Sequence, residues 1–191
     1  MIELIYPSTY PPTIPPAPLS SGTREESLPV VEPTGAVIGR TPRSYAHSGS
    51  KFLHPVVHLH VINRFGEIFL QKRAMTKKLL PGKWDTAVGG HVSYGESLRE
   101  ALYREASEEL GPFEFNPVYM CSYVYESDIE REFVTVFAAV GSFDLHPAND
   151  EVEEGRWWSE KELAKNMGKS VFTPNFESEY ARLGAALQAL L

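Results

Sequence analysis

The sequence is poor in cysteine and in basic residues, and each shortage excludes a class of protein. Cys121 is the only cysteine, so the chain cannot form an internal disulfide or a zinc ribbon, both of which need several thiols. Lys and Arg number 18 against 25 Asp and Glu, which gives a formal net charge of −7. This acidic balance argues against general binding to nucleic acids or anionic membranes, because such binders neutralise phosphates with a surplus of basic residues.

Long apolar segments are also missing. No apolar run approaches the roughly 18 residues that a membrane-spanning helix needs. No apolar stretch precedes Arg24, the first basic residue, as one would in a signal peptide. We therefore expect a reducing, cytoplasmic setting. Hydrophobic residues nevertheless make up 42% of the 191 residues, which is enough to bury the core of one domain.

Proline is concentrated at the N-terminus, where six of the 15 prolines fall within the first 18 residues. Proline removes a backbone donor and fixes φ, so residues 1–27 are expected to form an extended or disordered arm. A proline-rich ligand for a partner domain is the alternative interpretation of this segment. The composition becomes globular afterwards, and a single domain is expected over residues 28–191.

The pattern of the remaining sequence alternates strands with helices. A hairpin is expected over residues 29–39, strands over residues 54–63, 68–72, 87–89, 118–125 and 130–140, and a helix over residues 96–110. Ser159 to Glu162 resembles a capping box that opens a short helix, and Thr173-Pro174 is typical of the start of a last helix. This order of elements predicts an α/β sandwich with a mixed sheet.

The segment over residues 90–111 carries most of the chemical information. Four apolar residues share the buried face of its helix: Leu98, Leu102, Ala106 and Leu110. Glu105, Glu108 and Glu109 are spaced i, i+3 and i+4, so they converge on another face. Three neighbouring carboxylates repel one another unless a cation neutralises them, and such hard oxygen ligands suit Mg²⁺ or Mn²⁺. The alternative, a solvated acidic face, leaves this charge to be compensated by Arg104 and neighbouring side chains.

At these residues the sequence resembles the Nudix hydrolase family. The family box is Gly, five residues, Glu, seven residues, Arg-Glu, an aliphatic residue, any residue, Glu-Glu, any residue, Gly and an aliphatic residue. The matching residues are Gly90, Glu96, Arg104, Glu105, Ala106, Glu108, Glu109 and Gly111, and Pro112 replaces the final aliphatic residue. The resemblance implies a Nudix αβα sandwich with a mixed sheet over residues 28–191. It also implies that the three glutamates of the helix hold the metal, with Glu109 as the principal ligand, and that Arg104 belongs to the catalytic set.

A second resemblance, to the type I isopentenyl diphosphate isomerase branch of the Nudix superfamily, extends beyond the box. It is carried by Phe52-Leu-His54, Gln71-Lys-Arg73, Thr76-Lys-Lys78, Pro81-Gly-Lys-Trp84 and the stretch from Asp85 to His91. In that branch three histidines and two glutamates build a metal site. The matching positions are His47, His54, His91, Glu130 and Glu132. The resemblance thus implies a second site, whose mixed imidazole and carboxylate ligands suit a transition-metal ion such as Mn²⁺, Zn²⁺ or Fe²⁺.

The same resemblance assigns basic residues to the substrate. Arg73 and Lys77 match positions that grip the diphosphate, and Arg43 is a weaker candidate. Gly90 opens the box in the loop that is expected to approach the substrate phosphates. A solvated basic edge is the alternative interpretation of Arg73 and Lys77. The oligomeric state stays open, with a homodimer suggested by the resemblance alone.

Two departures from the isomerase branch favour a hydrolase. The isomerases place a catalytic cysteine directly before the first glycine of the box, whereas this chain has Gly89-Gly90-His91. They also have a degraded carboxylate helix, whereas this one is complete. We therefore expect an enzyme that uses Mg²⁺ or Mn²⁺ to hydrolyse a diphosphate bond in a nucleoside diphosphate derivative or other organic diphosphate. An isomerase with a substituted acid and a non-catalytic nucleotide-binding module stay open as alternatives.

Overall fold

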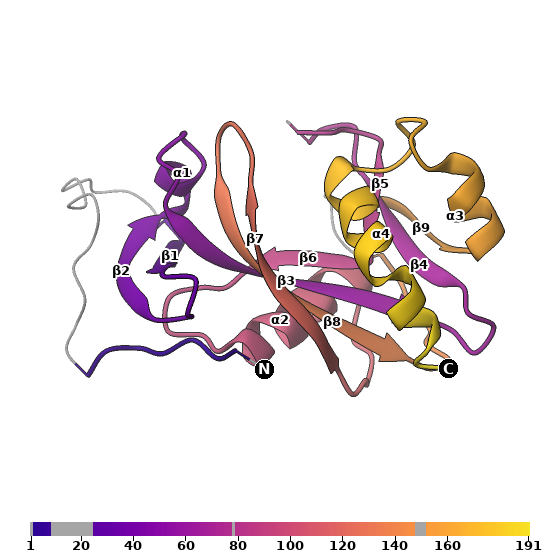
Figure 1. The fold of residues 1–191 in the computed structure, drawn as a ribbon, viewed down its shortest axis with the longest axis horizontal. Helices are drawn as coiled ribbons and strands as arrows, with labels where there is room; N and C mark the ends of the chain where they lie inside the picture. The colour runs from indigo at the N-terminus through magenta and orange to yellow at the C-terminus, as the bar shows by residue number, and fades with distance from the viewer. Residues whose placement is uncertain (1, 9–24, 78, 148–151) are drawn as a thin grey trace. The chain divides into compact units, whose positions relative to one another are not determined.

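The computed structural model describes residues 2–8, 25–77, 79–147 and 152–191 of the chain, which Figure 1 draws as a ribbon. The chain divides into two compact units. The first unit comprises Met1–Val57, Gly90–Tyr103 and Cys121–Thr135, and the second comprises His58–Gly89, Arg104–Met120 and Val136–Leu191.

The strands and helices follow the expected alternation. The strands are β1 (Ser27–Val31), β2 (Val37–Pro42), β3 (Leu53–Ile62), β4 (Ile68–Arg73), β5 (Trp84–Thr86), β6 (Val88–His91), β7 (Val118–Glu126), β8 (Arg131–Val140) and β9 (Val152–Trp158). The helices are α1 (Arg43–Ala46), α2 (Leu98–Leu110), α3 (Glu160–Asn166) and α4 (Pro174–Gln188). Within the described residues, no helix combines the length and the apolar character that crossing a membrane requires.

The strands form a two-stranded sheet, β1-β2, and a seven-stranded sheet whose main path is β5-β4-β3-β8-β7. β6 pairs with β3, and β9 pairs with β4. All ten residues of β3 are buried, as expected of a central strand that is covered on both faces. The mixed α/β architecture predicted from the sequence is confirmed. β5, β9 and α1 were not expected; β9 was missed because its polar Glu153 and Glu154 are typical of a loop.

The second unit has its core between the sheet strands and the two C-terminal helices. Thr173 caps α4 by accepting a hydrogen bond from the backbone of Phe176, and Pro174 occupies the first turn, as expected. The predicted apolar stripe packs on this core through Phe176, Tyr180, Leu183 and Leu187 of α4 and through Leu190, which follows the end of the helix. The capping box of α3 is also present, because Ser159 and Glu162 exchange side-chain and backbone hydrogen bonds.

The first unit is built on the β1–β2 hairpin, which pairs antiparallel as predicted. Residues 2–8 of the expected arm are packed against this unit: Ile5 donates to the carbonyl of Gly35 at 2.9 Å and accepts from Val37 at 2.8 Å. Gly35 has φ +87°, and a Cβ there would lie 2.6 Å from the carbonyl oxygen of Glu3, so this contact requires glycine. Residues 2–8 of the segment expected to be extended or disordered are docked, because their apolar side chains Ile2, Leu4 and Tyr6 pack on a small core. Residues 9–24, which contain five of the six prolines of the arm, lie outside the described residues.

Candidate active site and metal-binding residues

Helix α2 presents its carboxylates in three different environments. Its apolar residues Leu102, Ala106 and Leu110 are buried, as the helical spacing predicts. Of the glutamate side chains, that of Glu105 is 14% exposed and that of Glu108 is 55% exposed, whereas residue Glu109 as a whole is 7% exposed. The three glutamates of the box thus comprise one buried carboxylate and two that are accessible to different extents.

Arg104 compensates part of the charge on α2. Its guanidinium donates to Glu105 at 2.7 Å and to Glu108 at 3.4 Å. Glu109 instead turns to other elements of the same unit, because its Oε2 accepts from Gln71 Nε2 on β4 and from the backbone nitrogen of Gly89 on β6, both at 3.1 Å. Within the described part of the chain, the three carboxylates do not form a set whose oxygens all lie within 4.8 Å of one another. Their convergence on one site is thus less complete than the i, i+3, i+4 spacing suggested.

Glu109 carries the most strongly perturbed carboxyl of this helix. Burial raises its pKa to about 8, the negative charges of Glu105 and Asp85 add to the rise, and the hydrogen bonds from Gly89 and Gln71 oppose it. At neutral pH and without a cation, this carboxyl holds a proton. A bound divalent cation would restore its ionised form, so the buried carboxyl has the chemistry of a metal ligand that exchanges a proton for a cation.

The basic residues assigned to the substrate already have partners in the protein. Arg73 ends β4, donates to the carbonyl of Leu79 at 3.2 Å and lies 3.4 Å from a carboxylate oxygen of Asp85. Lys77 is half-buried in the loop that follows β4, in the same unit as Arg73. In the first unit, Arg43 opens α1 and pairs with Glu26 at 2.9 Å.

Asp85 is a residue of this region that the sequence analysis did not single out. Its second carboxylate oxygen accepts from the Thr173 hydroxyl at 2.7 Å, which ties β5 to the cap of α4. Gln71, the donor to Glu109, was likewise missed as a site residue. Both lie in the stretches that resemble the isomerase branch, and no local pattern marks them as partners of a site.

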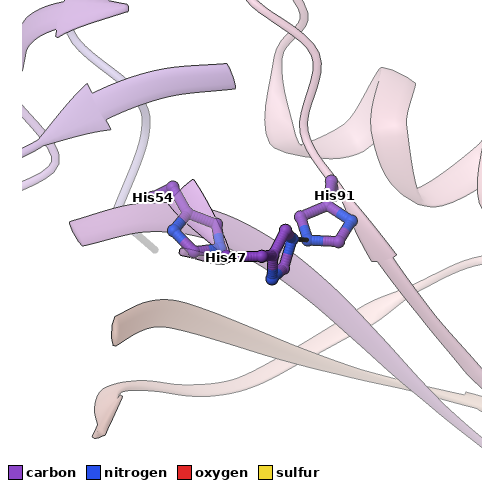
Figure 2. A group of neighbouring side chains, drawn as sticks. All are labelled: His47, His54 and His91. Carbon is purple, nitrogen blue, oxygen red and sulfur yellow. Dashed lines mark hydrogen bonds between the residues drawn. The ribbon is translucent and has the colours of Figure 1, made fainter. Parts of the chain in front are cut away.

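Three histidines from separate segments meet in the first unit, as Figure 2 shows. His54 lies on β3 and is fully buried, His47 follows α1, and His91 ends β6. One ring nitrogen from each lies within 4.8 Å of the other two. The Nε2 atoms of His47 and His91 are 3.0 Å apart. These are three of the five residues that the isomerase resemblance assigns to a metal site.

A hydrogen bond fixes which ring nitrogen of His54 carries a hydrogen and which bears a lone pair. Nδ1 of His54 lies 3.0 Å from the carbonyl oxygen of Phe52, which can only accept, so Nδ1 carries the hydrogen. Nε2 of His54 then bears a lone pair, and it is buried without a hydrogen-bond partner. Burial lowers the pKa of His54, and the bond to Phe52 opposes this only in part, so the ring is neutral at neutral pH. A buried, neutral imidazole nitrogen with no partner is a ready ligand for a cation.

His47 is oriented by a carboxylate in the same way. Its Nδ1 lies 2.5 Å from Oε2 of Glu130, so Nδ1 donates and Nε2 faces His91. Two nitrogens 3.0 Å apart require either a shared proton or a common cation between their lone pairs. Glu130 therefore contacts the histidine cluster through His47. Glu132, half-buried at the start of β8, does not belong to the set of mutually close ligand atoms in the described residues. The donor chemistry of the three imidazoles fits a transition-metal ion.

The described residues form a mixed α/β fold, with an Arg-Glu and Glu-Glu helix segment in the second unit and a cluster of histidines in the first unit. The chain belongs to the Nudix family, because the family model of the NUDIX domain matches residues 52–176. A relative from Leifsonia xyli subsp. xyli, named isopentenyl-diphosphate Delta-isomerase, is 32% identical over 178 residues, covering 85% of this chain and 93% of the relative.

The chain is also similar to a protein named as a hydrolase and to a solved structure. A relative from Streptomyces coelicolor, named an uncharacterized Nudix hydrolase, is 32% identical over 166 residues, covering 84% of this chain and 90% of the relative. A crystal structure from Deinococcus radiodurans has a TM-score of 0.69 and 23% identity, and covers 82% of this chain and 98% of that one. The last likeness supports the fold alone. The relatives by sequence thus include proteins named as isomerases and a protein named as a Nudix hydrolase.

Proposed function

We propose that this protein is a metal-dependent hydrolase that cleaves the diphosphate bond of a nucleoside diphosphate derivative or another organic diphosphate. The observation that carries this proposal is the environment of Glu109. The Nudix box, whose carboxylates are all present, supplies this carboxyl on α2, and Gln71 and Gly89 hold it in a buried position with its pKa raised to about 8. A buried carboxyl of this kind costs stability unless a cation binds to it, which is expected of a functional residue rather than of a packing residue.

The residues of the proposed site divide into ligands and substrate contacts. Glu109, Glu105 and Glu108 would hold Mg²⁺ or Mn²⁺, and Arg104 keeps the latter two carboxylates oriented through its hydrogen bonds. When bound, such a cation withdraws charge from the diphosphate oxygens and acidifies a water molecule. The chain itself would bind and orient the substrate.

The substrate phosphates would be bound by basic side chains, and in the second unit we assign this role to Arg73 and Lys77. In the first unit, Gly90 and Arg43 are proposed as substrate contacts; Gly90, expected in a loop, lies on β6. A phosphate would compete with Asp85 for the guanidinium of Arg73, whose present distance to the carboxylate, 3.4 Å, leaves that pair weak.

A second ion is proposed at the histidine cluster. His47, His54 and His91 would supply the nitrogens, with Glu130 orienting His47 and Glu132 as an additional oxygen ligand. The unpartnered Nε2 of His54 supports this assignment, because burying a polar atom without a partner costs about 1–3 kcal/mol.

The proposed activity is tested with a panel of diphosphate compounds incubated with Mg²⁺ and Mn²⁺, with the products identified by mass. The panel includes nucleoside diphosphate sugars, dinucleoside diphosphates and isoprenoid diphosphates. Hydrolysis in ¹⁸O-labelled water identifies which phosphorus is attacked. Release of monophosphate or phosphate that stops on chelation supports the proposal. A wild-type protein that binds these compounds but leaves all of them intact would instead indicate a non-catalytic binding module.

The names of several relatives favour a second candidate function, the isomerisation of isopentenyl diphosphate. Carbon protonation requires a positioned acid, and Gly89 has no side chain where the isomerases have a cysteine thiol. We therefore predict that the wild-type protein does not convert labelled isopentenyl diphosphate into dimethylallyl diphosphate. A protein from the isomerase branch with its cysteine in place serves as the positive control. Robust conversion by this chain would replace the hydrolase proposal with the isomerase one.

A further inference from the structure

A buried carboxylate lies between two histidines in the second unit and has no role in the site described above. Glu179 on α4 is 1% exposed. Its Oε2 accepts from His58 Nδ1 at 3.0 Å, and its Oε1 accepts from His60 Nε2 at 2.7 Å. His58 and His60 are two residues apart on β3, so both side chains leave the strand on the same face.

The cluster keeps Glu179 ionised. Burial by itself would raise the pKa of this carboxyl, but its electrostatic interaction with His58 and the hydrogen bonds from both imidazoles hold the pKa well below its usual range. A buried anion is stable only with such partners. The carboxylate therefore fixes the orientation of both rings.

The two histidines differ in what their other ring nitrogens meet. His60 is fully buried, its ring lies 6.3 Å from that of Phe176, and its Nδ1 has no hydrogen-bond partner. The side chain of His58 is 11% exposed. A Cβ on Gly89 would lie 3.7 Å from Nε2 and 3.5 Å from Cδ2 of His58. The Nε2 edge of His58 thus borders Gly89.

Gly89 connects His58 to the carboxylate helix. Its backbone nitrogen donates to Oε2 of Glu109 at 3.1 Å, so one residue contacts the buried Nudix carboxyl and borders the imidazole edge. Because Nδ1 of His58 donates to Glu179, the neutral form of this ring has its lone pair on Nε2, on the side of Gly89. A histidine whose Nδ1–H is held by a buried carboxylate and whose Nε2 borders a reaction site has the arrangement of a general base.

We propose that His58, oriented by Glu179, accepts the proton of the attacking water in the diphosphate hydrolysis proposed above, on which this inference rests. The water oxygen forms a new bond to phosphorus while the bridging P–O bond breaks, and the leaving phosphate takes the electron pair of that bond. The proton released by the water passes to Nε2 of His58 and from there to the leaving phosphate or to solvent. Glu179 is a positioning residue that fixes the tautomer and stabilises the imidazolium.

The test compares three glutamine variants on a diphosphate that the wild-type protein hydrolyses. His58→Gln is expected to lower kcat by roughly 10²- to 10³-fold, with KM within about threefold, because general-base catalysis contributes on this scale. Glu179→Gln is expected to lower kcat by about tenfold, since the ring stays but loses its orientation. His60→Gln is the comparison variant within the cluster, because it changes the other hydrogen bond to the same carboxylate. Its melting temperature should fall with that of His58→Gln, whereas its loss of kcat should not exceed the roughly tenfold loss expected for Glu179→Gln.

Two measurements separate a proton acceptor from a structural contact. Added imidazole should restore part of the activity of His58→Ala, whereas a packing role gives no such rescue. Long-range ¹H–¹⁵N NMR of the wild-type protein should show His58 with hydrogen on Nδ1 and a lone pair on Nε2, a pattern that Glu179→Gln disturbs.

The outcomes distinguish this inference from the proposed function. An active wild-type protein whose His58→Gln variant keeps its kcat, or whose His60→Gln variant loses as much, would show that His58 is structural while the hydrolase stands. A wild-type protein that hydrolyses no diphosphate would overturn both.

Discussion

Replacing Glu109 with glutamine is expected to lower the rate of diphosphate hydrolysis by roughly two to three orders of magnitude, the scale on which an electrostatic contact to the transition state contributes. Glutamine keeps the shape of the side chain and its hydrogen bond from Gly89, but it removes the charge that would bind the cation. The rate is measured at saturating Mg²⁺ and again over a range of Mg²⁺ concentrations. A variant that turns over near the wild-type rate would show that Glu109 is not the principal ligand.

The same substitution is expected to stabilise the metal-free protein at alkaline pH. The folded-state pKa of Glu109 is raised to about 8, so between its ordinary value near 4.5 and about 8 the folded protein holds a proton that the unfolded chain releases. Wild-type stability therefore falls as pH rises through this window, whereas Glu109→Gln lacks this loss. Since each unit of pKa corresponds to about 1.4 kcal/mol, the difference at pH 8 should amount to a few kcal/mol.

Chemical denaturation with chelator at pH 5 and pH 8 measures this difference. Glu108→Gln is the control, because its carboxylate is more than half exposed and its replacement should leave the free energy of unfolding nearly unchanged. Adding Mg²⁺ should raise the free energy of unfolding of the wild-type protein more than that of Glu109→Gln. Equal stability of wild type and Glu109→Gln at pH 8 would contradict the raised pKa.

The second large effect concerns the histidine cluster. Protein purified without chelator is expected to hold a transition-metal ion, and His54→Ala together with Glu132→Gln should abolish it. The single variants measure how much each residue contributes to metal binding. His54→Ala removes the buried nitrogen that has no hydrogen-bond partner, so it should lose most of the metal. Glu132→Gln should lose less metal, because Glu132 lies outside the set of mutually close ligand atoms. Elemental analysis measures the metal content, and thermal unfolding with and without Zn²⁺ or Mn²⁺ gives an independent readout.

His146→Ala is the control for these metal measurements. The side chain of His146 is 74% exposed and belongs to the second unit, so its loss should leave the metal content unchanged. Two outcomes would show that the three imidazoles are held together by hydrogen bonds alone. Either His54→Ala keeps the metal, or the wild-type protein binds none of the transition metals supplied.

The sequence predicted the elements that depend on local pattern and missed those that depend on distant partners. The spacing of Leu102, Ala106 and Leu110 predicted the buried face of α2, since helical periodicity is a local property. The helix begins at residue 98, two residues later than expected, because Ser97 and Glu100 exchange hydrogen bonds at its start. That exchange places Glu96 before the helix rather than in its first turn.

Local sequence patterns did not predict the environment of the site residues. The spacing of the three glutamates did not distinguish the buried Glu109 from the exposed Glu108. The partners of Glu109 are Gln71 on β4 and Gly89 on β6, which are distant in the sequence. Glu179 is more than 100 positions from His58 in the chain, so no spacing rule joins them. The histidine cluster was predicted only because the resemblance to a family aligns residues that the fold brings together.

The docked segment of residues 2–8 has a consequence for how the protein is prepared. The composition suggests trimming the first 27 residues, but doing so would strip Ile2, Leu4 and Tyr6 from the core of the first unit. Tyr6 also accepts from the backbone of Gly95 at 3.0 Å and donates to the carbonyl of Glu96 at 3.1 Å, within the box itself. A shortened protein would thus lose packing beside the loop that leads into the carboxylate helix, and affinity tags are better attached at the C-terminus, where they leave these contacts in place.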